Sequence, residues 1–116
     1  MEAQGNGHII NTASIGAHVV VPTAAVYCAT KYAVWAISEG LRQESKHIRV
    51  TTISPGVVKT ELGAEITDGA ALDLMKEIRK TALTPEAIAS AVLYAVSQPD
   101  DIDVNEVIVR LTKSAF

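Results

Sequence analysis

The chain has 116 residues, 48% of them hydrophobic and 20% charged, which fits one globular domain and excludes disordered, fibrous and disulfide-rich proteins. The 10 basic and 13 acidic residues give a formal net charge of −3 without any lysine- and arginine-rich run, so we expect neither a nucleic-acid partner nor a membrane surface. The single cysteine, Cys28, excludes an intrachain disulfide and fits a reducing compartment. No apolar run reaches the roughly 18 residues of a membrane helix, and the first residues lack the order of a signal peptide. We therefore expect a cytoplasmic protein.

The first half of the chain predicts a strand followed by a long helix. Residues 8–13 are apolar and β-branched, which indicates the strand, and residues 15–22 end in a proline and predict a loop. Thr23 stands where an N-cap should, before a helix over residues 24–45. Gly40 inside this helix costs up to about 1 kcal/mol relative to alanine, which suggests either tolerated strain or the close approach of a neighbouring element. The apolar residues of the helix recur at steps of three and four: Val26, Ala29, Ala33, Ile37 and Leu41.

The middle of the chain contains a second strand and a long, weakly patterned segment. Residues 48–54 are rich in β-branched side chains and end at Pro55-Gly56, which predicts a strand with a turn at its carboxyl end. Residues 57–83 show little pattern apart from a modest amphipathic helix near residues 71–80.

The last third predicts a helix and a third strand. Thr84 is a good N-cap, Pro85 suits the first helical position, and the helix should cover residues 85–97. Residues 104–110 then predict the third strand. Strands that alternate with helices predict right-handed crossovers and a parallel sheet, and therefore an α/β fold.

The candidate chemistry gathers around Tyr27 and Lys31, which share one helix face because they are four residues apart. An ammonium group within a few ångströms favours the phenolate form of a tyrosine, so Tyr27 is a candidate proton donor and acceptor. Ser14 follows the first strand, at the sheet edge where ligands bind, and its hydroxyl could orient a substrate carbonyl. Ser14 with His18 could also suggest a hydrolase, but the chain has no Gly-x-Ser-x-Gly elbow.

The other reactive side chains have plainer interpretations. His8 is expected to be a packing or edge residue of its strand, and His18 and His47 are expected at the surface. No spacing typical of metal ligands recurs, so no metal site is predicted. Cys28 is expected to be an ordinary small helix residue.

Three segments together resemble the carboxyl-terminal half of a short-chain dehydrogenase/reductase: residues 7–14 (GHIINTAS), 27–31 (YCATK) and 49–60 (RVTTISPGVVKT). The resemblance covers essentially the whole chain. Residues 105–110 (NEVIVR) are similar to a bacterial, NADP-preferring branch that acts on small hydroxy acids and related carbonyls. That branch usually continues Pro-Thr where this chain has Leu111-Thr112.

The resemblance implies a fold and a reaction. The fold would be the carboxyl-terminal half of a Rossmann-type, doubly wound parallel sheet, with residues 1–116 as one partial domain. Tyr27 would exchange a proton with the substrate oxygen while hydride passes between the substrate carbon and the nicotinamide of NADP or NAD. Lys31 would support the tyrosine and bind the nicotinamide ribose, and Ser14 would position the carbonyl of a small alcohol or carbonyl substrate.

The resemblance also implies a cofactor wall and an assembly. The backbone of Val58 and the hydroxyl of Thr60 would meet the nicotinamide carboxamide, while Pro55 and Gly56 would let the chain approach the cofactor. A homo-oligomer, either a dimer or a tetramer, is expected, and Trp35 could serve either a subunit interface or plain packing.

The family's glycine-rich phosphate loop has no counterpart in this sequence, which contains no Gly-x-x-x-Gly-x-Gly. We expect the amino-terminal, nucleotide-binding half to lie upstream of Met1, and the isolated chain to be inactive. The sequence leaves two interpretations open. One is a fragment of a longer oxidoreductase. The other is a non-catalytic remnant or assembly module that associates through its long helix or an open strand edge.

Overall fold

The computed structural model describes residues 1–60 and 66–116; residues 61–65, within the weakly patterned segment, and the side chain of Ile78 lie outside the described set. In chain order the elements are η1 (Glu2–Gln4), β1 (Gly7–Thr12), η2 (Ile15–Ala17), α1 (Ala25–Glu44), β2 (Ile48–Pro55), α2 (Gly69–Arg79), α3 (Pro85–Val96) and β3 (Glu106–Val109). In this part of the chain no helix is both long enough and apolar enough to cross a membrane.

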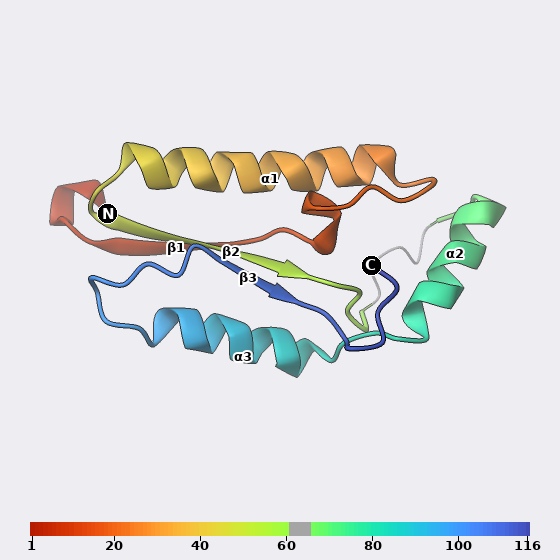
Figure 1. The fold of residues 1–116 in the computed structure, drawn as a ribbon. Coiled ribbons are helices and arrows are strands. Elements are labelled where there is room, and N and C mark those ends of the chain that lie inside the picture. Colours follow the sequence, from red (N-terminus) through yellow and green to blue (C-terminus); the bar gives the residue numbers. More distant parts are fainter. Residues whose placement is uncertain (61–65) are drawn as a thin grey trace.

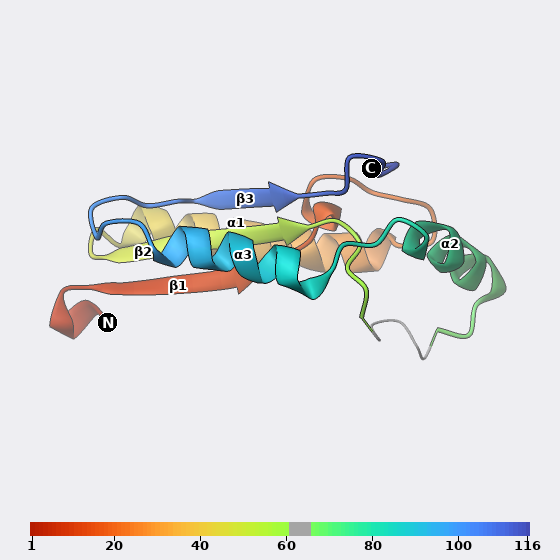
Figure 2. The same cartoon turned by 90° about the horizontal axis from the view of Figure 1, so that it is seen from below.

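The three strands form one parallel sheet in the order β1-β2-β3. Helix α1 covers one face and α3 covers the other, which gives three layers (Figure 1). Seen from below, β2 runs between the two outer strands, and α2 lies beyond the carboxyl ends of the strands (Figure 2). The predicted α/β arrangement with three parallel strands is confirmed.

The central strand β2 supplies most of the largest fully buried side chains because both of its faces are covered by helices. Val50 and Ile53 are fully buried, and Ala95 of α3 and Cys28 of α1 are buried on the two sides of the sheet. The β-branched run that predicted the strand is therefore the central layer of the core.

The predicted boundaries hold to within one residue, except that α2 starts two residues earlier and β3 two residues later than expected. The late start of β3 follows from the hydrogen bonds that β2 makes at Val50. An Asp103 carboxylate oxygen accepts the N–H of Val50 at 3.0 Å, and the amide of Asn105 donates to the Val50 carbonyl at 3.5 Å. Side chains thus replace the backbone ladder along the first part of β2.

The start of α1 differs from the prediction. Thr23 is not the N-cap; Ala24 occupies that position, and no side chain caps the helix. Thr23 instead has a φ of 69°, in the left-handed region that β-branched residues avoid. The tight turn that leads from Pro22 into the helix therefore uses Thr23 for its backbone geometry rather than for its hydroxyl.

The apolar repeat that predicted α1 does not mark its buried face. Val26 and Ile37 are 81% and 68% exposed, whereas Cys28 and Ser38 are buried against the sheet. The Ser38 hydroxyl donates to the Val34 carbonyl at 2.8 Å and accepts from the amide of Asn11 at 2.9 Å. Hydrogen bonding from β1 therefore allows a polar residue to occupy the helix face that packs on the sheet.

Gly40 does not mark a close approach. Among the described residues no atom lies within 4 Å of the position that a Cβ at Gly40 would take. Of the two explanations that the sequence left open, tolerated helix strain remains.

Candidate active site

A cavity of about 640 Å³ lies at the carboxyl edge of the sheet, where β1 and β2 end. All the site residues that the sequence predicts line it: Ser14, Tyr27, Lys31, Pro55, Gly56, Val58 and Thr60. The volume is in the range of small-molecule sites in proteins. The structure therefore brings together residues that are up to 46 positions apart, from Ser14 to Thr60.

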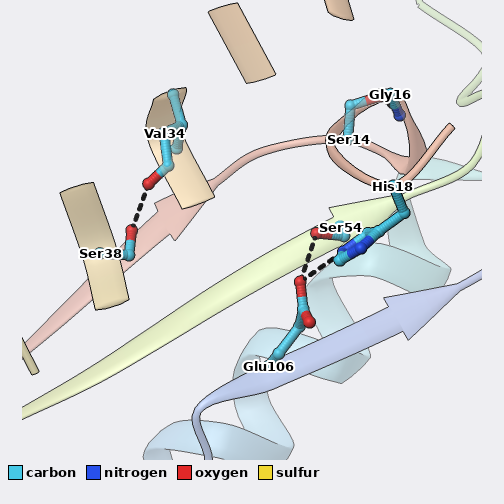
Figure 3. A network of polar contacts seen from close by, with 7 residues as sticks. All are labelled: Ser14, Gly16, His18, Val34, Ser38, Ser54 and Glu106. Atoms are coloured by element: carbon cyan, nitrogen blue, oxygen red, sulfur yellow. Dashed lines mark hydrogen bonds and ion pairs between the residues drawn. The ribbon is translucent and has the colours of Figure 1, made fainter. Parts of the chain in front are cut away.

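Ser14 follows β1 directly and caps the short helix η2. Its Oγ accepts the N–H of Gly16 at 3.0 Å (Figure 3). Because this bond uses a lone pair of the oxygen, the hydroxyl hydrogen can donate to another acceptor in the cavity. Ser14 thus has the local geometry of a donor that could meet a carbonyl oxygen.

Tyr27 and Lys31 occupy the first two turns of α1. The Lys31 Nζ lies 5.5 Å from the centroid of the Tyr27 ring, which is the distance range of a cation–π contact. The Tyr27 side chain is not buried; the residue is 42% exposed. The predicted pairing of a phenol with an ammonium group on one helix face is therefore present.

Gly16 brings the turn that carries Ser14 close to Tyr27. A Cβ at this position would lie 3.3 Å from Tyr27 Cε1 and 3.5 Å from both Cys28 Sγ and Ser14 Oγ. The missing side chain lets the turn pack directly against the ring edge. Cys28 of α1 is buried beneath this contact.

The strip from Pro55 to Thr60 forms another side of the cavity. Val58 makes an isolated parallel bridge with Leu83, in which Lys59 N–H donates to the Leu83 carbonyl at 2.8 Å and Leu83 N–H donates to the Val57 carbonyl at 2.7 Å. Because backbone groups alternate sides along an extended chain, the N–H and C=O of Val58 point away from Leu83. No residue in the described part of the chain pairs with them, so they can face a ligand.

Gly56 has a structural role that the sequence did not indicate. Its N–H donates to the Val109 carbonyl at 2.7 Å, and a Cβ there would lie 3.4 Å from Arg110 Cγ. The close approach that this glycine permits in the structure is to the end of β3.

Comparison with known proteins decides the family. A family model described as enoyl-(acyl carrier protein) reductase matches residues 1–103. Human dehydrogenase/reductase SDR family member 11 is 42% identical over 120 residues, which cover 93% of this chain and 44% of the human protein. The chain belongs to the short-chain dehydrogenase/reductase family. The resemblance read from the three sequence segments is thereby confirmed.

Two further relatives support the same family membership. An uncharacterized oxidoreductase of Staphylococcus saprophyticus is 51% identical over 114 residues, which cover 95% of this chain and 46% of that protein. The closed form of serine dehydrogenase complexed with NADP+ superposes with a TM-score of 0.85 at 30% identity, covering 98% of this chain and 48% of that one. The chain thus spans about half the length of the relatives it matches.

Next to the turn that carries Ser14, this short-chain dehydrogenase/reductase has a polar network that the sequence analysis missed. His18, expected at the surface, is exposed as a residue, yet its Nε2 lies 2.7 Å from Glu106 Oε2. The same carboxylate oxygen accepts from the hydroxyl of Ser54 at 3.0 Å (Figure 3). These residues come from three separate elements, and no local pattern in the sequence links them.

Proposed function

We propose that this chain is the catalytic half of an NAD(P)-dependent oxidoreductase that interconverts a small alcohol and its ketone or aldehyde. One observation carries the proposal: Ser14, Tyr27 and Lys31 line a single cavity at the carboxyl edge of the sheet, in a member of a dehydrogenase/reductase family. A general acid must lie within reach of the oxygen it protonates. This constellation supplies a phenol, a hydroxyl donor and a fixed positive charge.

Each residue has a distinct role in this proposal. In the direction of reduction, the Tyr27 hydroxyl gives its proton to the carbonyl oxygen, and in oxidation the phenolate takes the alcohol proton back. The Ser14 hydroxyl donates a hydrogen bond to the same oxygen and orients it. The Lys31 ammonium, 5.5 Å from the centroid of the ring, supplies a positive charge beside this phenol. The nicotinamide cofactor, when bound, supplies or accepts the hydride.

The residues present fit the nicotinamide end of such a cofactor. The N–H and C=O of Val58, which have no hydrogen-bond partner among the described residues, match a carboxamide, which has both a donor and an acceptor. Thr60 would add its hydroxyl, Lys31 would bind the ribose hydroxyls, and Pro55 and Gly56 would form the adjoining wall. NADP or NAD is the proposed cofactor. Because these 116 residues contain no Gly-x-x-x-Gly-x-Gly, we propose that they form one partial Rossmann-like domain and that residues outside them bind the phosphates and the adenosine.

A second candidate function is a non-catalytic assembly module. It is favoured by the exposed apolar side chains of α1, including Val26, Trp35 and Ile37, and by the outer edge of β1, which pairs with no strand in the described part of the chain. The same surface would serve the homo-oligomer, a dimer or tetramer, that we propose for the enzyme.

Titration of the isolated chain with NADPH, followed by fluorescence, distinguishes the two candidates. Micromolar binding would contradict the assembly module. A chain that binds no NADPH is expected to regain binding and turnover when it is joined to the amino-terminal half of the Staphylococcus saprophyticus relative.

The catalytic roles are tested in that joined protein with Tyr27→Phe. Loss of the phenol should abolish turnover while cofactor affinity stays the same, because the ring and its contacts remain. Tyr32→Phe is the matched control, since Tyr32 is an exposed tyrosine of the same helix outside the cavity. Substantial residual turnover in Tyr27→Phe would refute the proton-transfer role.

A further inference from the structure

The cavity has a polar end and an apolar wall. Beyond Ser14 and Tyr27, the wall is formed by side chains from three parts of the chain that the sequence analysis did not connect. They are Val19 and Val21 in the segment before α1, Leu74 and Met75 of α2, and Phe116 near the carboxyl terminus. All five are half-buried, so they face the cavity without being covered by other parts of the described structure.

Helix α2 presents this wall through one face. Ala71, Leu74 and Met75 lie at steps of three and four and line the cavity. Asp73 and Lys76, on the other side of the helix, are exposed and do not line it. The apolar face of α2 therefore lines the cavity instead of packing on the sheet, because the helix lies beyond the strand ends rather than on a sheet face (Figure 2).

Such a wall discriminates between substrates by desolvation. A hydroxyl or carboxylate that enters an apolar site loses its bonds to water and gains none, which is unfavourable. A methylene group, in contrast, gains affinity by leaving water. Among the described residues that line the cavity, the charged ones are Lys31, beside Tyr27, and Arg79, which lies exposed in the last turn of α2.

We infer that the substrate is an uncharged ketone, or the matching secondary alcohol, with an unbranched or cyclic apolar substituent of several carbons. This inference rests on the proposed oxidoreductase function for the position of the carbonyl. The carbonyl oxygen meets Ser14 and Tyr27, and the substituent packs between the valines before α1 and the Leu74–Met75 face of α2. Leu74 and Met75 are thus specificity-determining residues.

The test is a binding series on the full chain, with amide chemical shifts as the readout. The ligands are 2-butanone, 2-hexanone and 2-octanone. We expect affinity to rise about fourfold for each added methylene, with the shifts concentrated at the cavity residues. Leu74→Asn should weaken 2-octanone by about tenfold or more and leave 2-butanone nearly unchanged. Met75→Gln is the second variant, and Asp73→Asn is the matched control on the exposed side.

Each contrary result overturns the inference. The first such result is a ketone affinity that does not depend on the length of the alkyl chain, and the second is no binding of any ketone. The third is tighter binding of 7-oxooctanoate than of 2-octanone, with this preference lost in Arg79→Gln. Ketone binding is measured without hydride transfer, so the two proposals can fail separately. If ketone affinity rises with chain length but Tyr27→Phe keeps its turnover in the joined protein, only the proposed proton-transfer role is contradicted.

Discussion

The imidazole of His18 and the carboxylate of Glu106 lie 2.7 Å apart, although 88 residues separate them in the sequence. His18 follows the turn that Ser14 caps, and Glu106 begins β3. Ser54, at the end of β2, donates to the same carboxylate oxygen. One side chain of β3 therefore ties the candidate catalytic turn to the sheet.

Removing this carboxylate should loosen the turn. We expect Glu106→Ala to lower the free energy of unfolding by about 1–2 kcal/mol, because it leaves the buried Ser54 hydroxyl without its acceptor. The His18 and Glu106 side chains are 29% and 25% exposed, so their coupling in a double-mutant cycle should not exceed about 1 kcal/mol. Urea unfolding measures both quantities. Asp101→Ala, an exposed acidic residue, is the control and should change stability by less than about 0.5 kcal/mol.

Gly16→Ala tests the contact between the turn and Tyr27. The added methyl group would stand 3.3 Å from Tyr27 Cε1, and the exposed ring can yield more readily than the buried Cys28. We expect the Tyr27 ring to shift, with a loss of about 1 kcal/mol in the free energy of unfolding. The aromatic resonances of Tyr27 report the shift. Gly40→Ala is the opposite control, because it has open space in a helix interior and should gain about 0.5–1 kcal/mol. Unchanged Tyr27 resonances in Gly16→Ala would show that the Tyr27 ring does not pack closely against the turn at Gly16.

Relieving the backbone strain at Thr23 should raise the free energy of unfolding, whereas Glu106→Ala and Gly16→Ala should lower it. Asparagine tolerates the left-handed region far better than a β-branched residue. Thr23→Asn should therefore raise the free energy of unfolding by about 1 kcal/mol. The measurement is again urea unfolding, with Thr112→Asn as an exposed control outside this region. A loss of stability in Thr23→Asn would mean that the threonine side chain contributes more than its backbone costs.

His8 should make the stability of the fold depend on pH. Its pKa is lowered mainly by burial and further by Arg49, while Asp103 acts in the opposite direction. Its Nε2 lies 2.7 Å from Thr51 Oγ1, and its buried Nδ1 has no partner among the described residues, so protonation would leave a buried donor unsatisfied. The unfolded chain takes up the proton below about pH 6.5, whereas the folded chain resists it. Stability is therefore fully present above that pH and is lost as the pH falls below it.

The comparison of His8→Gln with the wild type at pH 7.5 and 5.5 measures this effect. The wild type should lose more stability between the two values than the variant does. His47→Gln, which leaves His8 in place, should retain the wild-type dependence. Equal losses in the wild type and His8→Gln would remove His8 as the cause.

The sequence alone determined the features that depend on neighbouring residues. The alternation of β-branched and amphipathic stretches predicts the parallel α/β order, because each period belongs to one kind of backbone. Thr84 and Pro85 locate the start of α3, and the Thr84 hydroxyl accepts the Ala87 N–H as an N-cap should. Tyr27 and Lys31 were paired correctly because the helix itself fixes residues four apart on one face.

Only the tertiary structure decided the relationships between distant segments. Ser38 rather than Ile37 faces the sheet because Asn11 of β1 supplies the hydrogen bond that a buried hydroxyl needs. The third strand begins late because the Asp103 carboxylate takes a backbone N–H of β2. The bond between His18 and Glu106 and the apolar wall facing Tyr27 likewise exist only where the folded chain brings separate elements together, since their partners share no local period in the sequence.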